Sequence, residues 1–98
     1  MKSRFAFFDP FGRPMTLMEW VFAFESGERI VGRDILPGGT LVSTVWDGLD
    51  ESLFEGEPLS IFETMVFNAK GETVMRERYS TFQEAREGHK RILEAFSC

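Results

Sequence analysis

The chain has 98 residues, of which 43% are hydrophobic and 28% are charged, and its formal net charge is −5. This length supports one hydrophobic core, so we expect a single domain over residues 1–98 and exclude a second one. The balance of apolar and charged residues excludes a disordered chain, and the single cysteine excludes a fold held by internal disulfides.

The sequence also bears on location. No apolar run approaches the roughly 20 residues that a membrane helix needs. The first residues lack the apolar stretch and the small-residue cleavage site of a signal peptide. We therefore expect a cytoplasmic protein that makes no contact with a membrane.

The first half of the chain predicts a strand, a turn and a helix. Residues 3–8 are typical of a short strand, and the prolines and glycine of residues 9–14 predict a turn. Thr16 and Glu19 have the spacing of a capping box, in which each side chain accepts a hydrogen bond from the other residue's backbone N–H. Apolar residues at helical spacing follow, and Gly27 marks the end of this helix.

The second half predicts four strands and a second helix. β-branched and aromatic residues place the strands at 29–36, 40–46, 59–67 and 73–79. The first two are joined by a short turn with two glycines, which predicts a hairpin. Thr81 has the position of a second helix cap, and apolar residues at helical spacing continue from there toward the C-terminus.

The element order β-α-β-β-β-β-α predicts the α+β class. We expect an antiparallel meander of about four to five strands, with both helices packed on one face of the sheet. The apolar faces of these elements predict a core made of Trp20, Phe24, Ile61, Phe62 or Met65, and Phe96.

Sequence motifs of catalysis and of cofactor binding are absent. There is no phosphate-binding P-loop, no dinucleotide-binding glycine motif, no nucleophile elbow and no zinc-protease motif. One histidine and one cysteine are too few ligands for a zinc site within one chain. The acidic stretch that begins at Asp47 lacks the alternating acids of a calcium-binding loop. We therefore predict that the protein is not an enzyme and binds no cofactor or metal.

A set of polar residues on the predicted strands and last helix is a candidate lining for a small pocket. This set comprises Ser43, Thr44, Glu63, Thr64 and His89. In the structural alternative, threonine serves only as a good strand former, and His89 is a core residue satisfied by Tyr79 or Glu63. We also expect Glu63 to form a cross-strand ion pair with Arg76 or Arg78.

The acidic residues of one segment account for the whole charge imbalance. They are Asp47, Asp50, Glu51, Glu55 and Glu57, with no base among them. Leu53 and Phe54 lie in the same segment and have no periodic partner in the predicted core. Apolar anchors among like charges suit contact with a basic protein surface, since charge speeds encounter and buried aromatic residues hold the complex. The alternative is a solvated loop with Leu53 and Phe54 tucked under the sheet.

Three stretches of the sequence resemble a family of small uncharacterised proteins encoded by bacteriophages and prophages. They are Ser-Thr-Val-Trp-Asp-Gly-Leu-Asp at 43–50, Phe-Glu-Thr-Met at 62–65 and Arg-Tyr-Ser-Thr at 78–81. Glu51 stands where members often carry His or Asn, which argues against a metal in this loop. The resemblance implies a phage origin and a host-cell cytoplasm, and it brings no established activity.

These observations favour a small phage accessory protein that acts by binding a host protein, in the manner of an anti-CRISPR inhibitor. That partner could itself be a protein that binds nucleic acid. Direct nucleic-acid binding is not expected, because the chain has no strongly basic face. The alternative is a small-molecule or nucleotide-binding domain without catalysis.

Overall fold

Four antiparallel strands form the main sheet of the computed structural model, which describes residues 7–27, 29–52 and 56–97. Their spatial order follows their order in the chain: β3 (Ile30–Ile35), β4 (Leu41–Trp46), β5 (Phe62–Phe67) and β6 (Thr73–Tyr79). Side chains alternate between the two faces along each strand, so β4 buries every second residue.

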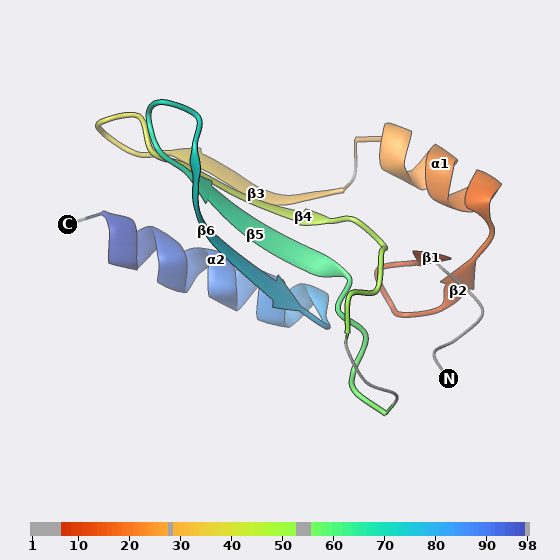
Figure 1. Cartoon of the computed structure of the whole chain (residues 1–98). Coiled ribbons are helices and arrows are strands. Elements are labelled where there is room, and N and C mark those ends of the chain that lie inside the picture. The colour runs from red at the N-terminus through yellow and green to blue at the C-terminus, as the bar shows by residue number, and fades with distance from the viewer. Residues whose placement is uncertain (1–6, 28, 53–55, 98) are drawn as a thin grey trace.

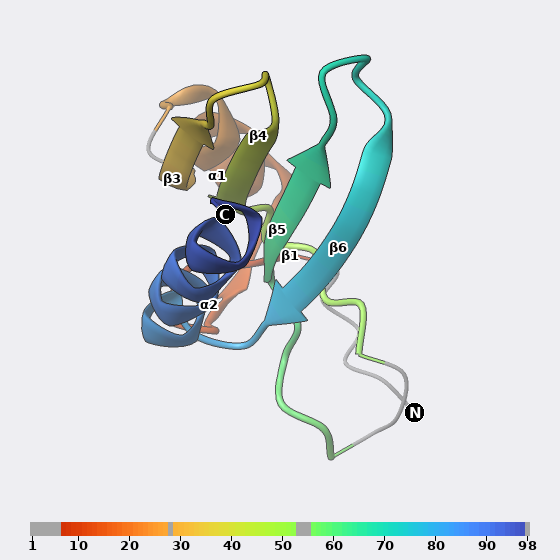
Figure 2. The ribbon, with the colours of Figure 1, turned by 90° about the vertical axis from the view of Figure 1, so that its left-hand side faces the viewer.

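Helix α2 (Phe82–Phe96) covers one face of this sheet, as Figure 2 shows. It buries Ala85, Gly88, His89 and Ile92 against the strands. A Cβ added to Gly88 would lie 2.4 Å from the ring of Tyr79, so only glycine allows the helix to approach β6 this closely. Thr81 caps the helix by accepting a hydrogen bond from the N–H of Glu84, as its sequence predicts.

The remaining elements lie at one end of the sheet, on the right in Figure 1. Strands β1 (Phe7–Phe8) and β2 (Pro14–Met15) form a small hairpin, and helix α1 (Leu17–Glu25) follows. The capping box of Thr16 and Glu19 is present at the start of α1. In α1, all of whose residues the structure describes, no residue is buried.

The core has two clusters on the face that α2 covers. The larger one contains Phe8, Trp46, Ile61, Phe62, Tyr79 and Ala85, and the smaller one contains Val42, Val66 and Ile92. Trp20 of α1 packs against the larger cluster and donates its indole N–H to the carbonyl oxygen of Asp47 at 2.7 Å. This contact ties α1 to the chain that leaves β4.

The predicted α+β class and the antiparallel meander are confirmed. In detail, α2 alone packs on the sheet face, whereas α1 contacts β1 at the end of the sheet. Pro14, predicted as part of a turn, and Met15, which follows that turn, pair with β1 as strand β2. In the described part of the chain, no helix has the length and apolar character to cross a membrane.

The predicted core is confirmed in part. Ile61 and Phe62 are fully buried, and Trp20 stacks on Phe24 with ring centroids 4.9 Å apart. Phe96, however, is exposed at the C-terminal end of α2. Met65 is half-buried on the face of the sheet away from α2, because its neighbours Thr64 and Val66 point toward the helix.

Candidate functional site

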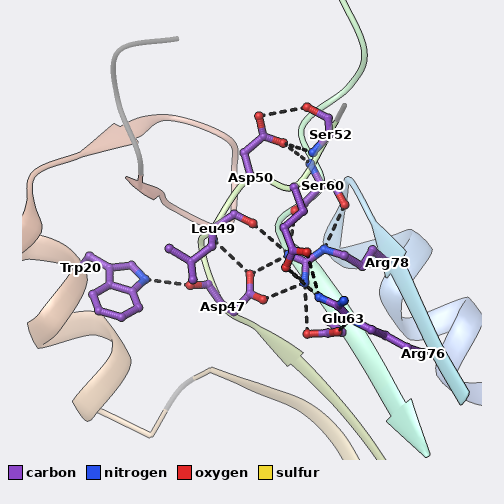
Figure 3. A network of polar contacts seen from close by, with 10 residues as sticks. Trp20, Asp47, Leu49, Asp50, Ser52, Ser60, Glu63, Arg76 and Arg78 are labelled. Atoms are coloured by element: carbon purple, nitrogen blue, oxygen red, sulfur yellow. Dashed lines mark hydrogen bonds and ion pairs between the residues drawn. The ribbon is translucent and has the colours of Figure 1, made fainter. Parts of the chain in front are cut away.

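Arg78 is the centre of a polar network on the face of the sheet away from α2 (Figure 3). Its guanidinium binds the carboxylates of Asp47 at 2.9 Å and of Glu63 at 3.0 Å. The same group donates to the carbonyl oxygens of Ser60 at 2.7 Å and Leu49 at 2.8 Å. Because the Arg78 side chain is only 13% exposed, these are contacts of a mostly buried charge, and its removal would leave Asp47 without an ion-pair partner among the described residues and Glu63 with Arg76 alone.

Arg76 extends the network toward solvent. It donates to Glu63, which is the ladder partner of Arg78 on β5, and binds both carboxylate oxygens of Glu51 at 2.8 and 2.9 Å. These hydrogen bonds, first of all the one to Glu63, raise the pKa of Arg76. The cross-strand pairing expected for Glu63 is therefore present with both arginines.

The carboxylates in this network are close enough together to suggest a cation site. One oxygen each of Asp47, Glu51 and Glu63 lies within 4.8 Å of the others. Each of these carboxylates, however, is paired with Arg76 or Arg78. The arrangement is therefore an internal ion-pair cluster that fastens the 47–60 segment to β5 and β6.

The predicted acidic segment has no arginine or lysine of its own, but in the structure two arginines of β6 lie beside it and pair with some of its acids. Asp47 and Glu51 pair with these arginines. Asp50 accepts hydrogen bonds from the N–H and hydroxyl of Ser52 and from the N–H of Ser60, each at 3.0 Å. Glu57 is exposed, whereas the predicted anchors Leu53 and Phe54, together with Glu55, lie outside the described residues. A role of this segment in partner binding stays a prediction.

A second polar network crosses the core between α2 and the sheet. Tyr79 donates to the hydroxyl of Thr64 at 2.9 Å, and that hydroxyl lies 2.5 Å from the hydroxyl of Thr44. Thr44 lies 2.6 Å from Nδ1 of His89, whose Nε2 lies 2.8 Å from the carboxylate of Asp34. A Cβ added to Gly32 would lie 2.8 Å from the His89 ring, so the missing side chain on β3 makes room for it.

The donor order in this chain of hydrogen bonds follows from its two ends. The carboxylate of Asp34 can only accept, so Nε2 of a neutral His89 carries the proton and Nδ1 accepts from Thr44. The hydroxyl of Thr64 then donates to Thr44 and accepts from Tyr79. Burial raises the pKa of the Tyr79 phenol, which keeps it in the protonated form that this order requires.

Asp34, His89 and Thr44 have the connectivity of an acid–base–nucleophile triad. Thr44 is nevertheless fully buried, and it lines neither of the two surface hollows described below. Among the described residues, every buried side-chain nitrogen or oxygen already has a hydrogen-bond partner. This network therefore holds α2 on the sheet and leaves no room for a substrate beside Thr44.

The structure divides the predicted pocket residues between two places. Thr44, Thr64 and His89 meet in the core, as part of the network just described. Ser43 and Glu63 lie on the opposite face of the sheet, because they are the strand neighbours of Thr44 and Thr64. The five residues therefore do not line a common pocket. His89 is satisfied as a core residue, with Thr44 and Asp34 as its direct partners in place of the expected Tyr79 or Glu63.

An open groove of about 640 Å³ lies between the β1–β2 turn and the start of α2. Trp46 and Phe62, both buried, contribute to its floor, and Phe11 and Phe82 rise beside it. Phe11 is 83% exposed and Phe82 is 49% exposed, although both are large apolar residues. The complete lining is Pro10, Phe11, Arg29, Val31, Trp46, Phe62, Ser80, Thr81, Phe82 and Gln83.

One basic side chain, Arg29, lines this groove, and two more line the hollow beside it. A second hollow of about 420 Å³ shares Phe82 and Gln83 with it and adds Arg86, Glu87 and Lys90. The guanidinium of Arg29 lies 4.3 Å from the Phe24 ring centroid, and that of Arg86 lies 6.0 Å from the Phe82 centroid. Within the described residues, Arg29, Arg86 and Lys90 form no ion pair.

Sequence reasoning missed this groove because its parts come from turns and element ends that are far apart in the chain. Phe11 belongs to a predicted turn, Arg29 begins a strand, and Phe82 begins a helix. One signal was available in the spacing of Phe82, Arg86 and Lys90, which places an aromatic ring and two cations on one helix face.

Comparison with protein-family models, curated proteins and solved structures finds no match to this chain. The resemblance to small phage-encoded proteins therefore gains no support from them. The functional argument rests on the site itself.

Proposed function

We propose that this protein is a small binding module that acts by occupying a surface of a partner protein and catalyses no reaction. The observation that carries the proposal is a concentration of exposed apolar side chains at one end of the molecule. We call this surface the apolar end and define it by Phe11, Leu17, Met18, Phe22 and Phe82, all of which are exposed. Large apolar side chains gathered in this way are typical of a surface that another molecule covers.

Helix α1 supports this proposal most directly. Trp20 and Phe24 of α1 stack on each other on the side that meets the rest of the fold, and Trp20 also stacks on Phe7. Met18 and Phe22 are 61% and 70% exposed, although a helix with one buried side usually has polar residues on the other. Apolar residues all round α1 therefore suit a helix that packs on its own fold and on a partner.

A host protein as partner, and a counter-defence role in the host cytoplasm, belong to this proposal through the sequence resemblance alone. The proposal of a binding module does not depend on them. It depends on the apolar end, which any partner would have to cover.

A small-molecule site without catalysis is the second candidate. The groove favours it, since its volume of about 640 Å³ falls within the roughly 300–1,000 Å³ typical of ligand pockets. Its floor is apolar, as such pockets usually are. The residues that would line it differ from the five that the sequence indicated.

Photocrosslinking tests the proposal. A photoreactive phenylalanine analogue replaces Phe11 or Phe22 at the apolar end, and Ile35 in a matched control. Ile35 is 75% exposed and lies beside the turn at the other end of the sheet. In lysate of cells that carry the gene, we expect one protein to crosslink at Phe11 and Phe22 and not at Ile35.

Equal crosslinking at all three positions, or none at any, would contradict a partner-binding apolar end. A thermal-shift screen with nucleotides and metabolites runs in parallel. A stabilising metabolite together with no crosslinked protein would favour the small-molecule candidate.

A further inference from the structure

We propose that the groove beside Phe11 and Phe82 receives an acidic peptide segment of the partner, with one aromatic or large aliphatic side chain as its anchor. This inference rests on the proposed function and names the chemistry of the partner. It follows from the apolar floor, the basic rim and the charge of the rest of the molecule.

The floor and walls of the groove specify an apolar anchor. Trp46 and Phe62 are almost fully buried and present no free polar group, while Phe11 and Phe82 leave large ring surfaces in water. A side chain inserted between those rings removes apolar surface on both partners from water. Aromatic anchors in such pockets commonly dominate the affinity of an interface.

The basic residues at the rim favour a peptide with negative charges beside that anchor. Arg29 lines the groove itself, and Arg86 and Lys90 line the adjoining hollow. Stacking on Phe24 and Phe82 places the two guanidinium groups against aromatic rings. Arg29 donates one N–H to the carbonyl oxygen of Phe24 at 3.2 Å, and its other N–H groups stay available to a carboxylate. Glu87, the acid in the hollow, accepts a hydrogen bond from Gln83 at 3.2 Å.

The whole chain carries a net charge of −5, so these unpaired cations stand out from a predominantly acidic protein. On a protein with a net negative charge, a group of unpaired cations favours docking of an acidic ligand at this position. The cations at the opposite face behave differently, because Arg76 and Arg78 are bound to carboxylates of the fold.

The test uses three synthetic fluorescein-labelled octapeptides and fluorescence anisotropy. One peptide has Phe-Leu flanked by aspartates and glutamates, the second has Ser-Ser between the same acids, and the third has Phe-Leu flanked by lysines. We expect the first to bind at least about tenfold more tightly than the other two, and to weaken as salt screens its charges.

Variants of the rim separate this site from general attraction. In the double variant Arg29→Gln, Arg86→Gln, we expect the affinity for the first peptide to fall about tenfold or more. Arg33→Gln removes an exposed arginine from β3, away from the groove, and is the matched control with unchanged affinity. Each variant is compared with the wild type by thermal unfolding, so that loss of the fold is recognised.

Equal binding of the lysine peptide, or unchanged affinity of the double variant, would overturn the inference. Displacement of the peptide by dodecanoate at lower concentration than peptide itself would point to a small anionic amphiphile and would also overturn it. So would concentration-dependent self-association that the double variant abolishes, because the occupant would then be a second copy. If Phe11 crosslinks a partner protein while no acidic peptide binds, the inference fails and the proposed function stands.

Discussion

The two helices show how differently the two ends of this protein use apolar side chains. Helix α2 is rich in charged residues, yet it supplies every buried helical residue in the described part of the chain. Helix α1 is largely apolar, yet it buries none. The position of each helix explains the contrast, since α2 lies across a whole face of the sheet, whereas α1 lies at the end and packs on β1 and, through Trp20, on the edge of the larger core cluster.

The comparison teaches that apolar content alone does not identify the core of a small domain. The sheet and α2 form a region in which apolar residues are buried and buried polar groups are hydrogen-bonded to each other. The apolar end leaves large side chains in water. Substitutions should therefore affect folding in the first region and binding in the second.

Arg78 should give the largest effect on folding. Arg78→Met leaves Asp47 and Glu63 without their buried cation, and we expect the free energy of unfolding to fall by about 3–5 kcal/mol in urea denaturation. Arg76→Met is the matched control, since the Arg76 side chain is 49% exposed and surface ion pairs contribute about 1 kcal/mol or less. Equal losses in both variants would mean that Arg78 has no special place in the fold.

The two helices can be compared directly by truncating one apolar residue in each. Ile92→Ala in α2 empties a site that is 1% exposed, and we expect a loss of about 2–5 kcal/mol in the free energy of unfolding. Phe22→Ala in α1 removes a larger side chain and should change it by no more than about 0.5 kcal/mol. A larger loss for Phe22→Ala would show that α1 belongs to the core after all.

Substituting His89 tests the core network, and we expect a loss of stability smaller than those for Arg78 and Ile92. His89→Gln cannot reproduce both ring contacts, so Thr44 or Asp34 loses its partner. We expect the free energy of unfolding to fall by about 1–3 kcal/mol, with partner crosslinking at Phe11 unchanged at a temperature where the variant is folded. If the variant melted normally but no longer crosslinked the partner, His89 would have a role in binding instead.

Tyr79 makes a smaller contribution to stability, and this contribution depends on pH. Because burial raises the pKa of its phenol above 10.0, the native state favours the neutral form. The stability that this provides is fully present below pH 10.0 and is lost as the pH rises through the raised value. The chain has one tyrosine, so alkaline phenolate absorbance reports this group alone.

We expect the phenolate to form at higher pH in the folded protein than in urea. Tyr79→Phe is the control, and it should remove this part of the alkaline loss of stability while arginine and lysine titrations remain. A phenolate transition at the same pH in the folded and unfolded protein would contradict the buried position of Tyr79.

Much of the fold could be predicted from the sequence because it depends on local signals. The Thr16 and Thr81 caps, the glycine turn between β3 and β4, and the β-branched strands all lie within a few residues of the structure they specify. The place of α1 could not be predicted in this way. Its apolar stripe is the same whether a sheet or a partner covers it.

The polar sites were harder to predict because they depend on which strands become neighbours. The acids from Asp47 onward have no base near them in sequence, and their arginines come from β6. Ser43 and Thr44 are adjacent in sequence but face opposite sides of the sheet. The pocket hypothesis grouped them by the polar character that they share, which does not distinguish the two faces of a strand.

The central claim is that the apolar end serves binding and leaves folding to the sheet and α2. The most direct test places the photoreactive analogue at Phe82 and introduces Phe11→Ser and Phe22→Ser together. The account predicts that partner crosslinking is lost while each serine changes the free energy of unfolding by no more than about 0.5 kcal/mol. Crosslinking that persists in this variant, or unfolding that becomes easier by several kcal/mol, would contradict it.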